Sequence, residues 1–361
     1  MSHGETTMTG STRHLIDLAG VQRGWVLELF QEAERLRAAR GTPEAPKPLA
    51  GRTAALVFHK PSLRTRVSFT VGMHELGGDA VDLGSAEVGH GRESVPDVAH
   101  VLSGMVDLVV VRTFSHRLVQ QLAQHATIPV INALTDHSHP CQILADLYTL
   151  QRRGRDLSSL TVTWVGDGNN VLHSWLEAAM IFPFQLRVAV PDGFEPDAGL
   201  FLMAERETDG RVRRVRDPND AVAGADVIYT DTWTSMGQEE ESAIRLAAFK
   251  GFRVDDDLLA LAKPDAVFMH CLPAHRGEEV TDEVLDGPKS AVFQQAENRL
   301  HAPTKMESHF TDRLPQPAHE VVEAEGFSGE RVPKRKSLKG FMDSIKDGLI
   351  DLFKEEGDAH L

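Results

Sequence analysis

The sequence is poor in cysteine, in basic residues and in uninterrupted apolar runs, and each shortage excludes a class of protein. Two cysteines among 361 residues, Cys141 and Cys271, are too few for a disulfide framework, so we expect a reducing, cytoplasmic environment. No apolar run approaches the length of a membrane span, and the polar residues 1–11 lack the apolar core of a signal peptide. Acidic residues outnumber basic ones, and the net charge of −15 argues against a general nucleic-acid or anionic-membrane surface.

The rest of the composition is that of a soluble globular protein. Hydrophobic residues make up 41% and charged residues 25%, and 361 residues suffice for two domains with large cores. Short apolar segments alternate with segments of helical periodicity, which predicts parallel sheets covered by helices on both faces. We therefore expect an α/β protein with two Rossmann-like domains, each with a central parallel sheet flanked by helices. They are expected at residues 1–150 and 151–302, followed by an extension at 303–361.

The alternation predicts where the strands lie. The expected strands are residues 54–58, 79–83, 108–112, 130–132, 160–165, 187–190, 227–230, 266–270 and 291–293. Before the first strand, residues 14–39 read as helical, with an interruption near Gly20. In such sheets ligands bind beyond the carboxyl ends of the strands, and the polar motifs of this sequence follow those ends.

The C-terminal extension differs from the rest of the chain. Residues 303–336 combine Pro303, Pro315 and Pro317 with many polar residues, which predicts a linker and argues against a helix directly after Arg299. Residues 337–353 carry a single apolar stripe, which predicts an amphipathic helix. This helix packs back on the first domain, clasps a neighbouring subunit or lies on a membrane surface. Its acidic residues disfavour the last alternative.

Ser62–Arg66 lie between a strand segment and a segment of helical spacing. At such a turn the free N–H groups and the positive end of the helix dipole face outward. Two hydroxyl groups and two guanidinium groups at this point form a suitable cradle for a phosphate group. The alternative is an ordinary serine N-cap with solvated arginines. A Walker loop is excluded, because its glycines and its Gly-Lys-Ser/Thr ending are missing.

Polar residues that follow other strands each have two interpretations. Arg112 can hold both a phosphate and a carbonyl oxygen, or take part in a surface ion pair. His137, His139 and Cys141 suggest a metal site, but their spacing matches no recognised zinc motif. Gly166–Asn170 suggests a dinucleotide fingerprint, but its third glycine and its downstream acidic residue are missing. We therefore expect neither a metal ion nor a nicotinamide cofactor.

The last two motifs contain a carboxylate and a thiol. Asp231 can pair with an ammonium group, and Gly237 gives the loop that follows it freedom to move. Cys271 comes directly after His270, which suggests a nucleophile with a nearby base. A cysteine hydrolase also needs an oxyanion hole and a partner base, which the sequence alone does not demonstrate. The two asparagines of the Gly166–Asn170 motif suit a zwitterionic amino acid.

Taken in order, these motifs resemble those of the aspartate/ornithine carbamoyltransferase family. They are Ser62-Leu-Arg-Thr-Arg66, Arg112-Thr-Phe-Ser-His116, His139-Pro-Cys-Gln142, Gly166-Asp-Gly-Asn-Asn170, Asp231-Thr-Trp-Thr-Ser-Met-Gly237, His270-Cys-Leu-Pro-Ala274 and Glu297-Asn-Arg299. The resemblance covers roughly residues 10–302, and the shared order is more specific than any one motif. The Ser-Met-Gly and His-Cys-Leu-Pro elements favour the ornithine branch of the family.

The resemblance implies transfer of the carbamoyl group of carbamoyl phosphate to the δ-amine of L-ornithine, giving L-citrulline and phosphate in arginine biosynthesis. The residues implied for catalysis are Arg112, His139, Asp231 and Cys271. Those implied for carbamoyl phosphate are Ser62, Leu63, Arg64, Thr65, Arg112, His139, Gln142, Cys271, Leu272 and Arg299. Those implied for ornithine are Asn170, Asp231, Ser235 and Met236. No metal and no other cofactor is implied.

The family is typically trimeric, and a loop of the adjacent subunit completes each site. Residues 87–93 correspond to that loop, but they lack the expected glutamine, and Leu63 stands where a threonine is usual. Carbamoyltransferases for N-acetylornithine, N-succinylornithine or putrescine therefore remain alternatives. A non-catalytic binding protein on the same scaffold is an alternative of another class.

Overall fold

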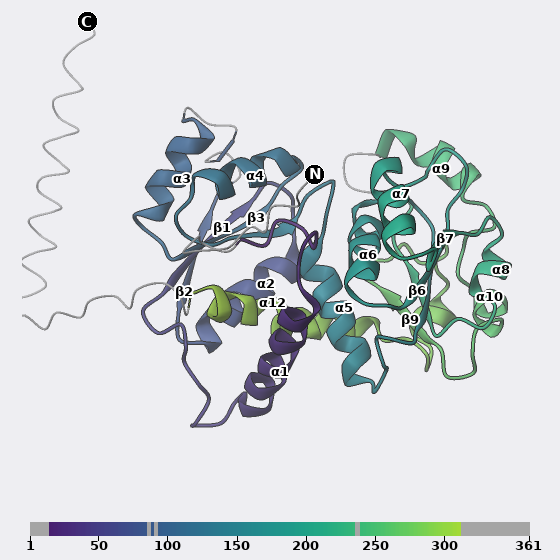
Figure 1. Ribbon diagram of the computed structural model, residues 1–361, viewed down its shortest axis with the longest axis horizontal. Helices are drawn as coiled ribbons and strands as arrows, with labels where there is room; N and C mark the ends of the chain where they lie inside the picture. The colour runs from purple at the N-terminus through teal and green to yellow at the C-terminus, as the bar shows by residue number, and fades with distance from the viewer. Residues whose placement is uncertain (1–13, 85–87, 90–92, 235–238, 312–361) are drawn as a thin grey trace, which may run out of the picture. The chain divides into compact units, whose positions relative to one another are not determined.

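The computed structural model describes residues 14–84, 88–89, 93–234 and 239–311 of the chain. Strands and helices alternate, and the strands form two sheets (Figure 1). The first sheet contains β1 (Thr53–Phe58), β2 (Asp79–Leu83), β3 (Leu108–Arg112) and β4 (Val130–Leu134). The second contains β5 (Thr161–Val165), β6 (Gln185–Ala189), β7 (Val212–Arg214), β8 (Val227–Thr230) and β9 (Val267–His270). Both sheets are parallel and flanked by helices, which confirms the predicted fold class.

Helices connect the strands. In chain order they are α1 (Arg23–Ala39), α2 (Leu63–Glu75), α3 (Val95–Ser103), α4 (His116–His125), α5 (Pro140–Arg152), α6 (Asn170–Ile181), α7 (Ala198–Glu207), α8 (Pro218–Val222), the 3₁₀ helix η1 (Glu239–Glu241), α9 (Ser242–Ala248), α10 (Asp256–Ala260), α11 (Asp282–Leu285) and α12 (Val292–Thr311). Three helices of the first sheet begin after a serine, Ser62, Ser94 or Ser115, whose hydroxyl oxygen accepts a backbone N–H group of the first turn. Such caps are readable from sequence and fix where each helix starts.

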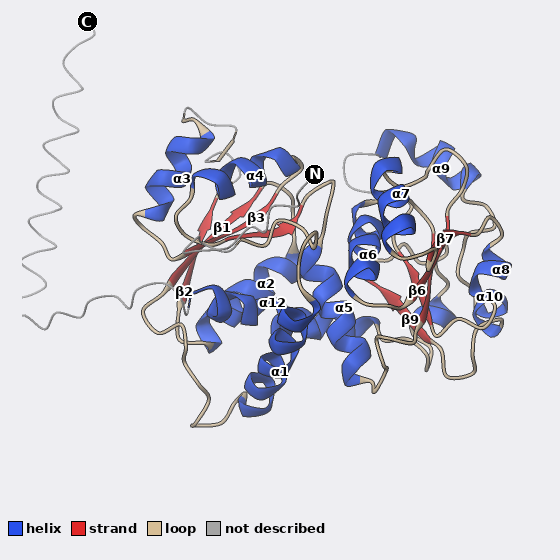
Figure 2. Ribbon diagram, in the orientation of Figure 1, coloured by secondary structure: helices blue, strands red, loops and turns tan. Residues whose placement is uncertain are grey.

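The first sheet separates two layers of apolar side chains. Along β1, Ala54, Leu56 and Phe58 join the core formed with α1, α2 and α5, whereas Ala55 and Val57 join the core beneath α3 and α4. Figure 2 shows α3 and α4 on one face of this sheet and α2 and α12 on the other. Because successive side chains of a strand point to opposite faces, a continuous apolar run is what a doubly covered strand requires.

The second sheet is built in the same way. Trp164 and Tyr229, on β5 and β8, stack at a centroid distance of 5.3 Å in the core that also contains α6. Their neighbours Val165 and Ile228 point to the opposite face, into a core with α8, α10 and α11. Helix α5 is buried from Pro140 to Leu150, and its apolar residues lie in one cluster with residues of both sheets. The described residues form one compact unit, so the division at residue 150 remains a prediction.

The strand order fixes where ligands can bind. The first sheet has the order β2-β1-β3-β4 and the second the order β7-β6-β5-β8-β9. In each sheet the chain reverses its direction of strand addition once, between β1 and β3 and between β5 and β8. Crossovers leave opposite faces of the sheet at such a point, which opens a crevice beyond the carboxyl ends of the two strands.

The N-terminal segment departs from the prediction. Residues 14–22 do not form a helix, and the Leu15 N–H group donates to the Val130 carbonyl at 2.9 Å while Asn132 N–H donates to the Leu15 carbonyl at 2.7 Å. This segment therefore extends the first sheet beside β4. Pairing satisfies backbone groups at the edge of β4, and this long-range gain outweighs the local helical periodicity.

The predicted strand at 291–293 is also wrong, because α12 begins at Val292 and the preceding Ser290 forms only an isolated bridge with Phe268. Helix α12 then passes Pro303 and ends at Thr311, so the predicted linker does not start at 303. The prediction that no helix follows Arg299 is therefore wrong. Proline costs a helix about 3 kcal/mol, and the packing of α12 on α5, α2 and α1 offsets this cost.

Three remaining points concern strand β7, membrane spans and the C-terminal segment. Strand β7 was not predicted, because its three residues are too few for a periodic signal. Among the residues that the structure describes, no helix has the length and apolarity that crossing a bilayer requires. The expected amphipathic helix at 337–353 lies outside the described residues.

Candidate active site

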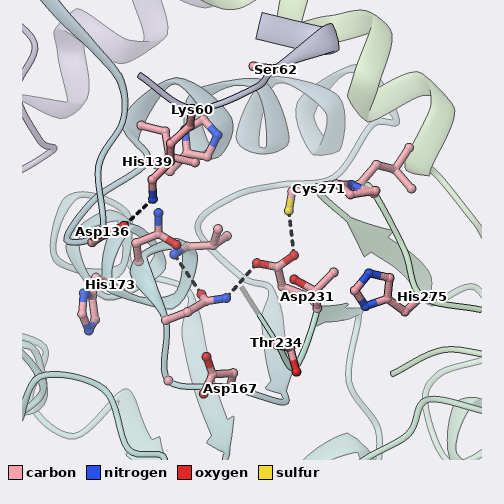
Figure 3. Close-up of a pocket in the computed structure, with 18 of the residues that line it drawn as sticks. Lys60, Ser62, Asp136, His139, Asp167, His173, Asp231, Thr234, Cys271 and His275 are labelled. Atoms are coloured by element: carbon pink, nitrogen blue, oxygen red, sulfur yellow. Dashed lines mark hydrogen bonds and ion pairs between the residues drawn. The ribbon is translucent and has the colours of Figure 1, made fainter. Parts of the chain in front are cut away.

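Residues at the carboxyl ends of both sheets surround one cavity of about 1030 Å³. Loops after β1, β3 and β4 line it from the first sheet, and loops after β5, β6, β8 and β9 line it from the second. Figure 3 shows Lys60 and His139 across the cavity from Asp231. The cavity thus brings together basic groups of one sheet and an acidic group of the other.

The turn after β1 supplies the start of α2. Ser62 is an N-cap, as one of the two interpretations expected, and its Oγ accepts the Thr65 N–H group at 3.3 Å. Leu63 occupies the first helical position, lines the cavity and is 76% exposed. Arg64 donates from Nη2 to the Leu272 carbonyl oxygen at 2.5 Å. This bond joins the first turn of α2 to the turn after β9.

Two more arginines complete the basic wall. Arg112 at the end of β3 and Arg299 on α12 are both buried and both line the cavity. Burial, together with the charges of Arg299 and Arg64, lowers the pKa of Arg112 to about 10. Burial and then the Arg64 charge lower the pKa of Arg299. Among the described residues, no carboxylate forms an ion pair with any of the three guanidinium groups, so their positive charge is available to an anionic ligand.

His139 lies at the N-cap position of α5, where Pro140 follows at the first helical position. Its backbone N–H group donates to the Ser174 hydroxyl oxygen at 2.9 Å, which holds the turn against α6. Burial, reinforced by Arg299 and Arg112, lowers the pKa of His139 far below its usual value. The imidazole is therefore neutral at neutral pH. Its Nδ1 atom is buried without a hydrogen-bond partner in the part of the chain that the structure describes.

Gln142 is fully buried and does not line the cavity itself. Its Oε1 atom accepts Arg299 Nη1 at 2.5 Å, and its Nε2 atom donates to Asp146 Oδ1 at 2.8 Å. Asp146 also accepts from the Tyr229 hydroxyl group and from Gln295 Nε2. Burial raises the pKa of Asp146 to about 7. Asp146 was not predicted from the sequence, although it lies one helical turn after Gln142.

The opposite wall carries a carboxylate, a thiol and an amide. Cys271 Sγ donates to Asp231 Oδ1 at 2.9 Å, and Asn169 Nδ2 donates to Asp231 Oδ2 at 2.7 Å (Figure 3). Burial and the Asp231 carboxylate raise the pKa of the Cys271 thiol well above its usual value. The thiol is therefore protonated, which argues against a thiolate nucleophile. Asp231, Cys271, Arg64 and Arg112 share one cavity, as the sequence interpretation required.

Comparison with known proteins agrees with this geometry. Residues 13–152 match the model of the aspartate/ornithine carbamoyltransferase carbamoyl-P binding domain, and residues 158–305 match that of the Asp/Orn binding domain. The chain belongs to the aspartate/ornithine carbamoyltransferase family.

Individual relatives extend this assignment. This carbamoyltransferase is 47% identical to the ornithine carbamoyltransferase of Chlorobaculum tepidum over 293 residues. The aligned residues cover 80% of this chain and 87% of the relative. A structure of ornithine carbamoyltransferase from Pyrococcus furiosus superposes with a TM-score of 0.79 at 43% identity, covering 83% of this chain and 97% of that one. The structure of the Thermus thermophilus enzyme gives a TM-score of 0.75 at 44% identity, with coverage of 82% and 98%.

Some predicted site residues of the carbamoyltransferase are placed differently or not described. Asn170 lines the cavity at the start of α6, but its Nδ2 atom donates to the Thr135 carbonyl at 2.6 Å. Ser235 and Met236 lie outside the described residues, as do four of the seven residues at 87–93. Their predicted contacts remain predictions.

Two groups of described side chains in the carbamoyltransferase have ligand atoms close enough to hold a metal ion: Asp231, His270 and Cys271, and His275, Glu278 and Glu279. In the first group both ring nitrogens of His270 already have partners in Leu272 and Glu279. In the second, a Glu279 oxygen accepts two hydrogen bonds. These bonds compete with metal coordination.

Two basic residues of the carbamoyltransferase cavity were also not predicted from the sequence. Lys60 is 5% exposed, pairs with Asp136 and lies 4.1 Å from the Phe114 ring centroid. Arg245 is buried and donates to Asp167 Oδ1 at 3.1 Å and to the Trp233 carbonyl at 2.9 Å. Burial raises the pKa of Asp167 to about 6 against the effect of Arg245. Lys60 lies two residues before Ser62, just outside the Ser62–Arg66 motif, whereas no motif pointed to Arg245.

Proposed function

We propose that this chain is an ornithine carbamoyltransferase that converts carbamoyl phosphate and L-ornithine to L-citrulline and phosphate. The observation that carries the proposal is the shared cavity, in which Arg64 and Arg112 face Asp231 and Cys271. The guanidinium groups suit a dianionic acyl phosphate, and the carboxylate suits the ammonium group of a diamino acid. The names and identities of the relatives support the same reaction.

Phosphate binding is assigned to the N-terminus of α2. The free N–H groups of its first turn, the helix dipole and the hydroxyl groups of Ser62 and Thr65 all favour an anion there. A backbone N–H group at Leu63 takes the place of the hydroxyl group that threonine would supply. Arg64 and Arg299 add charge and forked donors, which hold the phosphate as a leaving group.

The carbonyl oxygen of carbamoyl phosphate is assigned to Arg112 and His139. A neutral imidazole still has one N–H donor, and a buried guanidinium remains charged near neutral pH. Donors fixed in a cavity stabilise the oxyanion that develops when the carbonyl carbon becomes tetrahedral. The carbamoyl NH₂ group needs an acceptor, which the Leu272 carbonyl supplies, while Gln142 acts from behind the cavity wall by orienting Arg299.

Ornithine is assigned to the opposite wall. Asp231 and Cys271 orient the δ-amine, and Asn170, Ser235 and Met236 contact the rest of the molecule. The δ-ammonium group must lose a proton before its nitrogen can attack. A C–N bond then forms to the carbonyl carbon, and the C–O bond to phosphate breaks. The nitrogen loses a second proton as the adduct collapses, so no covalent enzyme intermediate is needed. Much of the rate derives from holding the two substrates in attacking geometry.

Assembly, domain division and location are proposed on the family resemblance. Residues 1–150 would bind carbamoyl phosphate and residues 151–302 ornithine, close to the residues that the two family models match. A homotrimer is expected, with residues 87–93 reaching a neighbouring site, and sedimentation equilibrium tests it. Neither cysteine forms a disulfide, which agrees with the cytoplasm and with a role in arginine biosynthesis there.

The deciding experiment is a substrate panel. Purified protein with carbamoyl phosphate is assayed against ornithine, N-acetylornithine, N-succinylornithine and putrescine, and the carbamoylated product is quantified. We expect citrulline from ornithine and little product from the other three. Arg112→Met should abolish turnover, whereas Arg117→Met, on the exposed side of α4, should not change it. Turnover with another amine alone would reassign the substrate, and binding without turnover would favour a non-catalytic scaffold.

A further inference from the structure

Two buried residues outside the predicted site hold the turn that follows β9. His270 and Glu279 are both 0% exposed, and His270 Nε2 lies 3.1 Å from Glu279 Oε1. Glu279 Oε1 also accepts the backbone N–H group of His275 at 2.6 Å. Such bonds hold a buried carboxylate and a buried imidazole in place. Glu279 Oε2, by contrast, is buried without a hydrogen-bond partner among the described residues.

The other ring nitrogen of His270 pairs with the backbone of Leu272, a residue that lines the cavity. The Leu272 N–H group lies 2.9 Å from His270 Nδ1, and a backbone N–H group can only donate. Nδ1 therefore accepts, and the ring proton is on Nε2, where it is donated to Glu279. The Glu279 carboxylate thus selects the tautomer that can hold Leu272.

Leu272 needs such support. Its φ angle is +57°, and among the described residues Asp209 is the one other non-glycine residue with a positive φ. Aspartate tolerates this left-handed region, whereas for leucine it is strained. The carbonyl group of Leu272 accepts Arg64 Nη2 at 2.5 Å, and Leu272 lines the cavity. The turn therefore presents a carbonyl acceptor to the Arg64 guanidinium group at the cavity.

We propose that His270 and Glu279 are positioning residues for carbamoyl phosphate. Glu279 fixes the His270 tautomer, His270 holds the Leu272 N–H group, and the strained Leu272 directs its carbonyl oxygen towards Arg64. The carbonyl thereby orients Arg64 before the ligand binds and meets the carbamoyl NH₂ group afterwards. This inference rests on the proposed carbamoyl phosphate site, but its test does not require turnover.

Two substitutions of the same side chain separate the two ring nitrogens. His270→Asn places an amide oxygen near the position of Nδ1 and preserves the acceptor for Leu272. His270→Gln places an amide nitrogen near the position of Nε2 and preserves the donor to Glu279. Each variant loses one buried hydrogen bond, so a merely structural role predicts equal effects. We expect the Kd for carbamoyl phosphate, measured by titration calorimetry without ornithine, to rise about 10- to 100-fold in His270→Gln. In His270→Asn it should rise less than about fivefold.

Glu279 gives an independent comparison if the histidine variants fail to fold. Glu279→Gln keeps an oxygen that accepts from His270 and His275, and it should bind carbamoyl phosphate nearly as wild type does. Glu279→Leu removes the acceptor and should resemble His270→Gln. Equal Kd values for the two histidine variants, or for the two Glu279 variants, would overturn the proposal. Wild-type protein that binds carbamoyl phosphate but makes no citrulline would refute the proposed function instead and leave this comparison intact.

Discussion

Replacing Glu177 by glutamine should stabilise the protein, and more so as the pH rises. Glu177 lies on α6, is 3% exposed, and accepts the Leu18 N–H group on Oε2 at 3.0 Å. Burial, with a further contribution from the Asp17 carboxylate, raises its pKa from 4.5 to about 8. Below pH 4.5 the carboxyl group is protonated in both the folded and the unfolded chain. Between 4.5 and 8 the unfolded chain releases a proton that the folded chain retains, so the free energy of unfolding falls as pH rises.

The size of the effect follows from the same two values. The difference between 4.5 and 8 corresponds, at about 1.4 kcal/mol per pH unit, to a cost of about 5 kcal/mol above pH 8. Glutamine carries no charge and keeps an oxygen for the Leu18 N–H group, so Glu177→Gln should recover most of this cost. The gain should be about 1 kcal/mol near pH 5.5 and several times larger near pH 9.

Urea denaturation of wild type and Glu177→Gln, followed by tryptophan fluorescence across this pH range, measures the gain. Glu177→Leu is the matched control, because it removes the charge and also leaves the Leu18 N–H group unpaired. We expect it to be about 1–3 kcal/mol less stable than Glu177→Gln at every pH. A difference between wild type and Glu177→Gln that does not change with pH would refute the reasoning, since the carboxyl group would then not titrate in this range.

Three further predictions concern the cavity. Cys271→Ala should lower kcat/KM for ornithine about 10- to 100-fold in steady-state kinetics, because it removes the thiol donor. Iodoacetamide should label wild-type Cys271 slowly at neutral pH, as followed by mass spectrometry, because the pKa of this thiol is raised. Arg299→Met should raise the KM for carbamoyl phosphate at least about 100-fold and change the KM for ornithine little. The substitution removes a positive charge and leaves Gln142 Oε1 without its donor. An unchanged KM for carbamoyl phosphate would place the phosphate elsewhere. Arg245→Met should destabilise the fold by about 3–5 kcal/mol in urea at pH 8, because the buried Asp167 carboxyl group must then either stay charged without its partner or take up a proton. A loss below about 1 kcal/mol would contradict this prediction.

Much of the candidate site was predictable because sequence order determines where parallel strands end. Arg64 and Arg112 follow β1 and β3, and Asp231 follows β8. Each of these residues lies at the carboxyl end of a strand next to a switch point, where residues far apart in sequence must meet. Apolar runs identified those strands without knowledge of their partners, since a doubly covered strand is apolar on both faces.

Other features depended on contacts that no local pattern encodes. Leu15 joins a sheet edge because β4 has free backbone groups there, and Pro303 lies within α12 because that helix has three packing partners. Gln142 was predicted to reach the ligand, but its amide is engaged by Arg299 and Asp146. The choice of hydrogen-bond partner is decided by tertiary packing, which spacing along the chain does not reveal.

The partners of the three arginines show how the protein retains positive charge for its ligand. Arg64 donates to a carbonyl group, and Arg299 donates to an amide oxygen and to the Thr65 hydroxyl group. These neutral acceptors orient the guanidinium groups without cancelling their charge, whereas carboxylates would have cancelled it. Burial and mutual repulsion lower the pKa of Arg112 to about 10, so the empty cavity is electrostatically unfavourable. A dianion relieves this repulsion when it binds. The nearest carboxylate in the hydrogen-bond network, Asp146, is separated from Arg299 by Gln142. Asp146 therefore orients the arginine cluster without pairing with it directly, and the positive charge of the arginines remains available to the substrate.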